Sequence, residues 1–387
     1  MARRTTFEVK PAIESIAKIK VVGVGGSGGA AINRMLARKI RSIEFIAMNT
    51  DLQALQQSLA DVKLQIGKET TRGLGAGMNP DLGARSAEEN ADEIRKMIGD
   101  ADMVFLTCGL GGGTGSGAVP VIADIAREAG ALTVAVVTKP FKFEGAQRRR
   151  IAEDAYERLI DKVDTIITIP NDRLLQIVDK KTSLLEAFAV VDDVLNQGVI
   201  GISELITIPG MINVDFADVK AIMNGAGSAL MGIGVASGED RAVMAARAAV
   251  ESPLLEVSIE GARGVLFVVT AGPSLTMHEV NAAAEVITAS ADPEAKIIFG
   301  TVIDERMGDE LKATVIATGF RSFSEKGKEK RLQQEPRNEQ FRQQATETPS
   351  VHRSVFFKPK ESVPDTTSEP HDELDIPTFI RNQMKKR

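Results

Sequence analysis

The chain has 387 residues, with 47 Lys+Arg against 53 Asp+Glu, an apolar fraction of 43% and a charged fraction of 26%. These values are typical of a globular protein of roughly two or three domains. No run of about 18 consecutive apolar residues occurs, which argues against a membrane-spanning helix, and the basic N-terminus lacks the apolar run of a signal peptide. A single cysteine, Cys108, excludes an internal disulfide framework, and three histidines leave little material for a structural zinc site. The expected compartment is therefore the reducing cytoplasm.

Charge and glycine are distributed unevenly along the chain. Of the 34 glycines, only Gly327 lies beyond residue 320. The whole chain has a net charge of −6, which divides into −9 for the first 320 residues and +3 for residues 321–387. An acidic core is a poor candidate for a nucleic-acid-binding surface, and we expect no nucleic acid to bind there.

Short β-rich runs alternate with helical stretches in the first half of the chain. We predict strands over residues 19–24, 43–48, 62–66, 103–107, 132–138 and 165–169, and helices over 30–38 and 86–98. The second helix is expected to start at Ser86, because Ser86-Ala87-Glu88-Glu89 is close to a capping box. Strands separated by helices predict a doubly wound parallel sheet, in which ligands bind at the carboxyl ends of the strands.

A long helix and a second α/β unit follow. Apolar residues recur every three or four positions from Ser183 to Ile206, and Pro209-Gly210 ends the pattern. A helix of this length is expected to run between domains. Residues 213–320 predict helices near 215–223 and 238–250 and strands at 264–270, 295–303 and 311–318.

The composition changes abruptly after Phe320. Residues 321–371 are rich in Glu, Gln, Lys, Arg, Pro, Ser and Thr, which predicts a disordered linker. Apolar residues return in the segment 372–381, before the basic end 385–387. This short segment is a candidate peptide for a partner's groove, or else a chance apolar patch in a disordered tail.

Two glycine-rich runs follow predicted strands and open predicted helices. The first, Gly23-Val24-Gly25-Gly26-Ser27-Gly28-Gly29, contains a GxGxxG pattern. Glycines let backbone N–H groups approach a phosphate, and the helix N-terminus favours an anion. A ligand-free tight turn is an alternative. A dinucleotide oxidoreductase is a second alternative, because Asp51 after the second strand is the kind of acidic residue that binds a ribose in that class.

The second run, Gly109 to Gly117, argues against the oxidoreductase. Two phosphate cradles at neighbouring strand ends suit a di- or triphosphate better than a nicotinamide, and Thr114 and Ser116 add hydroxyl donors. A flexible glycine linker is the alternative, but the position of the run between a buried strand and a helix argues against it. No GxxxxGK[ST] pattern occurs, so no P-loop lysine is expected.

At this point the sequence resembles the tubulin/FtsZ family. Residues 111–117 (GGGTGSG) match the tubulin signature, and Asn49-Thr50-Asp51 and the segment 213–218 (NVDFAD) match FtsZ. The similarity spans roughly residues 15–320 and resumes at 372–381. Ser27 and Ala30 stand where the family usually has Gly and Asn, and Asp192 stands beside Asp193 where Asn is common.

The resemblance implies an α/β fold of several parts. It implies a flexible N-terminus (1–15), a doubly wound, parallel-sheet GTP-binding domain (16–182), a long central helix (183–209), a smaller α/β activation domain (210–320), a disordered linker (321–371) and a partner-binding peptide with a basic end (372–387).

The resemblance also assigns GTP or GDP to the glycine-rich site, residue by residue. Phosphate contacts are implied for Gly25, Gly26, Gly29, Ala76, Gly77, Gly111, Gly112, Gly113, Thr114 and Gly115. Ser27, Gly28, Asn49 and Asp51 are implied nucleotide-binding residues without a more specific role. Ribose contacts are implied for Thr138, Glu144 and Arg148, and guanine recognition for Asn171, Phe188 and Asp193. Mg²⁺ is expected on the phosphates and solvent, with no dedicated protein metal site.

Asp215 and Asp218 lie three residues apart at the start of a predicted helix, where they could simply cap it. In the family, this loop enters the nucleotide pocket of the next subunit, which makes Asp215, Asp218 and Asn213 candidate catalytic residues acting in trans. The implied protein is a GTP-hydrolysing, head-to-tail polymer of the bacterial division ring at midcell. Its peptide 372–381 would bind division proteins such as FtsA, so that the membrane is reached only indirectly. A nucleotide-binding scaffold with little turnover is the alternative.

Overall fold

The structure is a computed structural model that describes residues 17–37, 43–176, 181–207, 214–255, 259 and 261–320. All of them belong to one compact unit, Met1–Glu325. The predicted N-terminal segment 1–15 and the linker and peptide beyond residue 320 lie outside the described residues, so these predictions stay open.

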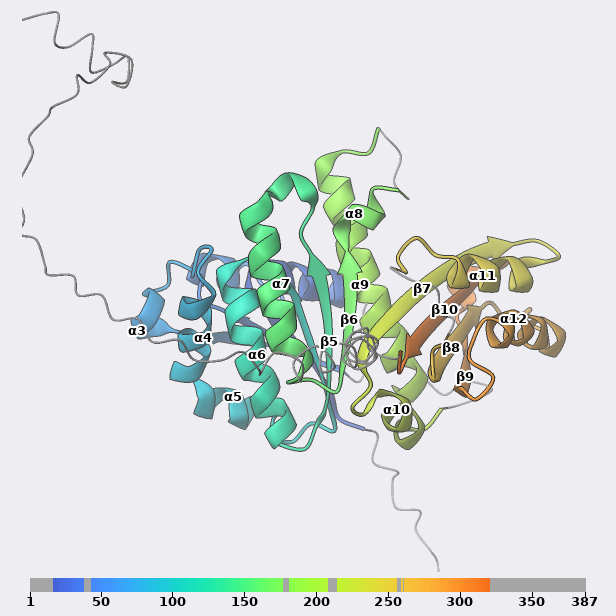
Figure 1. Cartoon of the computed structure of the whole chain (residues 1–387), viewed down its shortest axis with the longest axis horizontal. Helices are drawn as coiled ribbons and strands as arrows, with labels where there is room; N and C mark the ends of the chain where they lie inside the picture. The colour runs from blue at the N-terminus through green and yellow to red at the C-terminus, as the bar shows by residue number, and fades with distance from the viewer. Residues whose placement is uncertain are drawn as a thin grey trace, which may run out of the picture. The chain divides into compact units, whose positions relative to one another are not determined.

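Ten strands in the described part of the chain form one sheet, in the order β3-β2-β1-β4-β5-β6-β7-β10-β8-β9 (Figure 1). They are β1 (Ile19–Val24), β2 (Ile43–Asn49), β3 (Val62–Gln65), β4 (Met103–Gly109), β5 (Leu132–Lys139), β6 (Thr165–Pro170), β7 (Gly227–Ser237), β8 (Gly264–Ala271), β9 (Lys296–Ile303) and β10 (Glu310–Thr318).

The helices have the following bounds. They are α1 (Gly25–Ala37), α2 (Leu52–Gln56), α3 (Lys68–Thr71), α4 (Pro80–Glu89), α5 (Ala91–Ile98), α6 (Gly113–Glu128), α7 (Ala146–Ile160), α8 (Asn171–Leu174), α9 (Leu184–Thr207), α10 (Phe216–Met223), α11 (Arg241–Val250) and α12 (Met277–Ala289), with short 3₁₀ turns at Lys142–Glu144 and Glu305–Met307.

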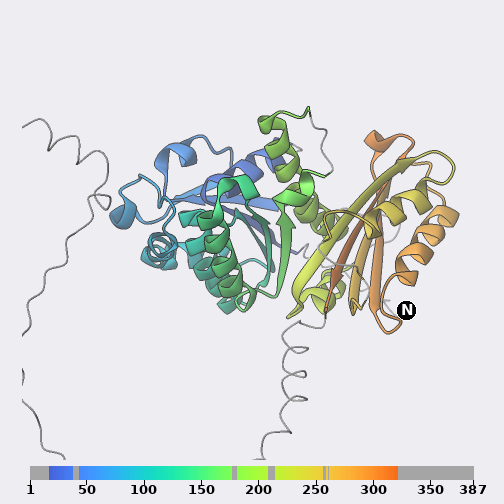
Figure 2. The same cartoon turned by 45° about the horizontal axis from the view of Figure 1, so that its top comes forward.

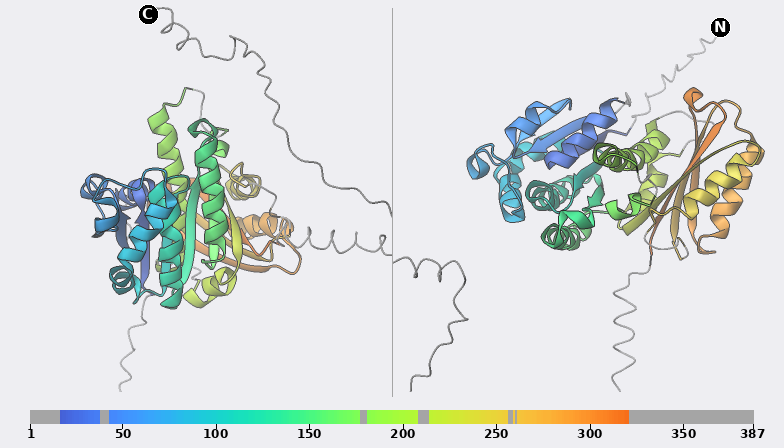
Figure 3. Two further views of the ribbon diagram at one scale, coloured as in Figure 1. Left: turned by 60° about the vertical axis from the view of Figure 1, so that its left-hand side comes forward. Right: turned by 90° about the horizontal axis from the view of Figure 1, so that it is seen from above.

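Strands β1 to β6 are all parallel and carry helices on both faces, as the alternating pattern predicts (Figure 3). Side chains alternate across the sheet. Val21 of β1 packs with α1 and α9 on one face, whereas Val22 packs with α5, α6 and α7 on the other. The doubly wound parallel sheet is therefore confirmed, and it brings the carboxyl ends of β1, β4, β5 and β6 to one edge.

The C-terminal strands form a mixed continuation of the same sheet. Strand β7 pairs in parallel with β6 over three residues and antiparallel with β10, while β8 and β9 are parallel to each other. Helices α11 and α12 cover one face (Figure 2). The opposite face shares a core with α9, which explains why apolar residues recur along this helix as far as its C-terminal end.

Two sequence-based predictions of local structure were wrong. The predicted helix 86–98 is two helices, and its expected cap, Ser86, lies inside α4. The α4 N-cap is Asn79, whose side chain accepts from the N–H groups of Asp81 and Leu82, and Pro80 takes the first helical position. Asn90 then separates α4 from α5.

Strand β7 was missed altogether, because its glycines weaken the strand pattern. A Cβ on Gly232 would lie 2.0 Å from the Ala249 carbonyl oxygen, and one on Gly234 would lie 2.1 Å from that of Ala245. Helix α11 packs so closely on β7 that only glycine fits at these positions.

Candidate functional site

A cavity of about 350 Å³ opens at the carboxyl ends of β1, β4, β5 and β6. Thirteen of the predicted ligand-binding residues form its wall. They are Gly25, Gly26, Ser27, Gly77, Gly112, Gly113, Thr114, Gly115, Thr138, Glu144, Arg148, Asn171 and Phe188. Gly28, Gly29, Asn49, Asp51, Ala76, Gly111 and Asp193 are not part of the wall, whereas Asp192 is.

Both glycine runs end in helices that start at the cavity. Helix α1 begins at Gly25, which takes a left-handed backbone conformation with φ of 74°, and α6 begins at Gly113. The first N–H groups of a helix have no partner within it, and the helix dipole places partial positive charge there. Two such helix ends on one cavity wall form a site for an anion with more than one phosphate.

Three hydrogen bonds join the loops around the phosphate end. The Gly113 N–H donates to the Gly77 carbonyl over 2.7 Å, and the Thr114 and Thr50 hydroxyl oxygens lie 2.7 Å apart. The Gly109 N–H donates to Ser27 Oγ, also over 2.7 Å. These contacts hold four separate segments of the chain around one space.

Asn49 and Asp51 shape this region from behind the wall. The Asp51 carboxylate caps α2 by accepting from the N–H groups of Gln53 and Ala54. Asn49 Oδ1 accepts from the Asp51 N–H over 3.1 Å. Their side chains therefore hold the turn that carries Thr50 toward Thr114. Ala76 is likewise buried beside Gly77.

An ion pair stands on the wall beside Thr138. Arg148 Nη1, in the first turn of α7, lies 2.5 Å from Oε2 of Glu144, which ends the preceding 3₁₀ turn. Glu144 Oε1 also accepts from the Phe141 N–H over 2.9 Å, so this carboxylate is held in place from two sides. A guanidinium oriented in this way can donate further hydrogen bonds to a polar ligand.

Helix α9 contributes one face to the cavity. Phe188, Val191, Asp192 and Leu195 line it, which is the i, i+3, i+4, i+7 pattern of one helical face. Asp193 lies about 100° further around the helix and falls off this face. Helical spacing from Phe188, which is visible in the sequence, thus places Asp192 on the face that lines the cavity.

Asp192 is a carboxylate in a largely buried place. Its side chain is 13% exposed, and Oδ2 lies 2.9 Å from Arg34 Nε on α1. Burial raises its pKa to about 6, although the charge of Arg34 opposes this. Nearby, Asn171 Oδ1 is buried and has no hydrogen-bond partner among the described residues. This end of the cavity thus offers an aromatic ring, a carboxylate and an unsatisfied amide oxygen to a planar polar ligand.

The predicted catalytic pair lies on the side of the sheet where the parallel strands begin, opposite the cavity at their carboxyl ends. Asp215 caps α10, and its Oδ1 accepts from the Asp218 N–H over 2.8 Å. Both residues are exposed. Helix α10 ends against the first residue of β6, where Thr165 Oγ1 donates to the Met223 carbonyl. The third predicted catalytic residue, Asn213, lies outside the described residues.

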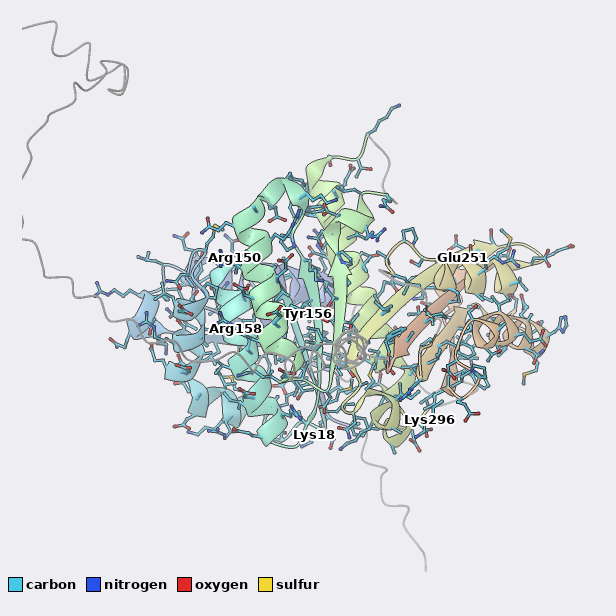
Figure 4. The ribbon with its side chains drawn as sticks, in the orientation of Figure 1. Lys18, Arg150, Tyr156, Arg158, Glu251 and Lys296 are labelled. Atoms are coloured by element: carbon cyan, nitrogen blue, oxygen red, sulfur yellow. The ribbon has the colours of Figure 1, made fainter. Side chains whose placement is uncertain are left out.

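The polarity of the sheet can be followed in the figures. Arg150, near the start of α7, lies toward the end of the molecule that carries α8, whereas Lys18, just before β1, lies toward α10 (Figure 4). The aspartates of α10 therefore cannot reach the cavity of their own chain.

The residues that the structure describes include neither a metal-binding cluster nor a membrane-spanning helix. No group of three His, Cys, Asp or Glu side chains is placed to hold a metal ion. No described helix is long and apolar enough to cross a bilayer. Cys108 is buried below the second glycine run, and burial raises the pKa of its thiol to about 12, as expected for a packing residue.

Comparison with known proteins gives the family of this chain. Residues 18–179 match the GTPase domain of the tubulin/FtsZ family, and residues 227–321 match the FtsZ C-terminal domain. The structure of an empty FtsZ dimer from M. jannaschii is 48% identical, with 78% of this chain and 88% of that chain covered and a TM-score of 0.76.

The chain belongs to the tubulin/FtsZ family. A tryptophan-to-tyrosine mutant of the same M. jannaschii FtsZ matches at 48% identity over 79% of this chain and 91% of that chain, with a TM-score of 0.76. CetZ1 from Haloferax volcanii in its GDP-bound form shares the fold at 20% identity, over 81% of this chain and 98% of that chain, with a TM-score of 0.69.

Membership in this family decides between the alternatives that the sequence left open. The protein is a GTPase of the tubulin/FtsZ type, with the GTP-dependent polymerising role that characterises the family. The oxidoreductase reading of the first glycine run is wrong, because the same pattern here opens a GTPase domain. GTP and GDP are accordingly the ligands of this family's site.

Proposed function

We propose that this FtsZ-family protein polymerises head to tail and hydrolyses GTP only where two subunits meet. The observation that carries the proposal is the separation between the cavity and Asp215 and Asp218. From Phe188 on the cavity wall to Thr207 at the end of α9, the helix rises by about 29 Å at roughly 1.5 Å per residue. Asp215 follows beyond that end.

Head-to-tail assembly would bring the two halves together. If α10 of one subunit meets the open cavity of the next, the contact is heterologous and repeats into a filament. Asp215 uses Oδ1 for its cap, which leaves the second carboxylate oxygen for an attacking water. Asp218 lies beside it on the same exposed end of α10. Asn213 belongs to the same loop and is proposed to help orient this water.

Within one subunit, we assign the phosphates to the two glycine runs and the base to α9. The N–H groups at the starts of α1 and α6 and the Thr114 hydroxyl would bind the phosphate oxygens. The Glu144–Arg148 pair would lie against the ribose. Mg²⁺ would be held by phosphate oxygens and water, in keeping with its reluctance to lose hydration.

We assign guanine recognition to Asp192 in place of the Asp193 expected from the sequence. Guanine presents a ring N–H and an exocyclic amine side by side, and one carboxylate can accept from both. Asp192 lines the cavity one helical turn from Phe188, on which the base would stack. Adenine lacks this donor pair, so it would exclude water from the Asp192 carboxylate while leaving Arg34 as its only hydrogen-bond donor among the described residues, which is costly.

The remaining proposals concern cellular context. We propose that the protein acts in the cytoplasm at the midcell division site, and that the segment 372–381 binds division proteins such as FtsA, which would connect the filament to the membrane. The apolar positions of that segment, Leu374, Ile376, Phe379 and Ile380, support peptide-in-groove recognition.

Mixing two inactive variants tests hydrolysis across subunits. Asp218→Ala removes a proposed catalytic group, while Gly113→Val would push a side chain within 2.6 Å of the Gly77 carbonyl oxygen and close the cavity. In equal mixtures that co-sediment, about one interface in four pairs an intact cavity with an intact Asp218, so activity should return to roughly that fraction. Lys220→Ala, an exposed change on the same helix, is the control and should stay active. Co-sedimenting mixtures that regain no activity at any ratio would refute the proposal.

A further inference from the structure

Ser27 connects the two glycine runs through its side chain. It is the third residue of α1, and its Oγ accepts a 2.7 Å hydrogen bond from the N–H of Gly109, at the end of β4. These residues are 82 positions apart in the chain. A glycine, which the sequence resemblance leads one to expect at position 27, could not make this contact.

The hydroxyl of Ser27 still has a hydrogen to donate. A serine hydroxyl is one donor and two acceptors, and the bond from Gly109 uses only an acceptor position. No described residue accepts a hydrogen bond from Ser27 Oγ. Ser27 is exposed and forms part of the cavity wall, so an acceptor can reach it only from within the cavity or from solvent.

The surroundings of this hydroxyl suit a phosphate oxygen. Ser27 lies in the first turn of α1, whose N–H groups face the anion end of the cavity, and the first turn of α6 lies opposite. Gly25 lies against Thr114 and Gly115, since a Cβ built on it would be 3.3 Å from the Gly115 nitrogen. Ser27 therefore lies on the cavity wall where the first glycine run contacts the second, and it is hydrogen-bonded to Gly109.

We propose that Ser27 is a phosphate-binding residue that also locks the two glycine loops together. Its Oγ accepts from the Gly109 N–H while its O–H donates to an oxygen of the α- or β-phosphate. The bond to Gly109 would hold the two loops in the conformation that binds nucleotide, and the phosphate would add one charge-assisted hydrogen bond. This inference rests on the proposed placement of the phosphates at the glycine runs.

Ligands with and without phosphate separate this role from a purely structural one. Ser27→Ala and Ser27→Gly should weaken GDP binding by about 10-fold or more, the effect of losing one hydrogen bond to a charged group. The affinity of both variants for guanosine, measured by competition with labelled GDP, should stay within about 2-fold of the wild-type affinity, because guanosine has no phosphate. Ser290→Ala, which removes a hydroxyl bonded to the Val286 carbonyl on α12, is the matched control and should change neither affinity.

A second measurement tests the link between the loops. Hydrogen exchange at the Gly109 amide of the nucleotide-free protein should be faster in both Ser27 variants than in wild type. Unchanged GDP affinity, an equal loss for GDP and guanosine, or unchanged exchange at Gly109 would each overturn the inference. Failure of the proposed phosphate placement looks different, because wild type itself would then bind GDP no more tightly than guanosine.

Discussion

Asp192 should make guanine nucleotide binding depend on pH in a way that its neutral variant does not. Burial raises the pKa of this carboxyl to about 6 in the empty protein. Only about one tenth of the molecules are then ionised at pH 5, against about nine tenths at pH 7. If the ionised carboxylate accepts from guanine, GDP affinity should rise about 10-fold over this range.

The comparison with Asp192→Asn isolates this contribution. The terminal phosphate of GDP also titrates near pH 6, and that change is common to both proteins. The ratio of wild-type to variant affinity, measured by calorimetry or with fluorescent GDP at each pH, should therefore increase about 10-fold from pH 5 to pH 7. Asp193→Asn is the matched control and should keep the wild-type profile. A constant ratio, or loss of the pH dependence in the Asp193 variant alone, would refute the assignment.

The same group predicts an opposite trend for the stability of the empty protein. Because the folded-state pKa is raised from 3.8 to about 6, the folded protein binds this proton more tightly than the unfolded chain. Stability from this group is fully present below the unfolded pKa and is lost as pH rises through 6, by about 3 kcal/mol. Asp192→Asn should thus raise the melting temperature more at pH 8 than at pH 5. An equal change at both pH values would contradict this reasoning.

Three further outcomes are expected. Arg241 lies 2.6 Å from Glu279 and holds the pKa of that carboxyl at about 2. Glu279→Gln should therefore lower the free energy of unfolding at pH 7 by about 3 kcal/mol, measured with denaturant. The wild type should lose this stability between about pH 4.5 and 2, and the variant should not. Gly234→Ala forces a Cβ against α11 and should destabilise the fold by about 1–3 kcal/mol, whereas Gly238→Ala, with an open surrounding but a left-handed φ, should cost only about 1 kcal/mol in the same measurement. Deleting residues 372–387 should leave GTP turnover and sedimentation of filaments intact while binding to the tethering partner is lost; loss of sedimentation would argue against a separate tail function.

Periodicity in the sequence was sufficient for the parallel half of the sheet. Strands β1, β4, β5 and β6 are runs buried on both faces, so their positions and order of alternation with helices could be predicted. Strand β7 could not be predicted, because Gly232 and Gly234 are required by close contact with α11, which follows β7 in the chain. The break between α4 and α5 falls at Asn90, whose side chain makes no cap hydrogen bond to α5 and instead accepts from the Gly67 N–H, a distant contact that no local pattern indicates.

The candidate site shows the same division between local pattern and spatial arrangement. Both glycine runs lie on the cavity wall as their strand-to-helix positions predict. By contrast, the bond between Ser27 and Gly109 and that between Thr50 and Thr114 join distant segments, and no local pattern indicates them. The family resemblance points to Asp193, whereas helical spacing from Phe188 favours Asp192, and the pH comparison of the two variants decides between them.

The dependence of GTP turnover on protein concentration tests shared-site hydrolysis most directly. Turnover per subunit should be near zero below a threshold concentration and rise steeply above it, at the same concentration at which light scattering reports assembly. Asp218→Ala should assemble above the same threshold without this rise in turnover. Constant turnover per subunit from well below the threshold would contradict the account, because a single chain would then hydrolyse GTP with its own residues.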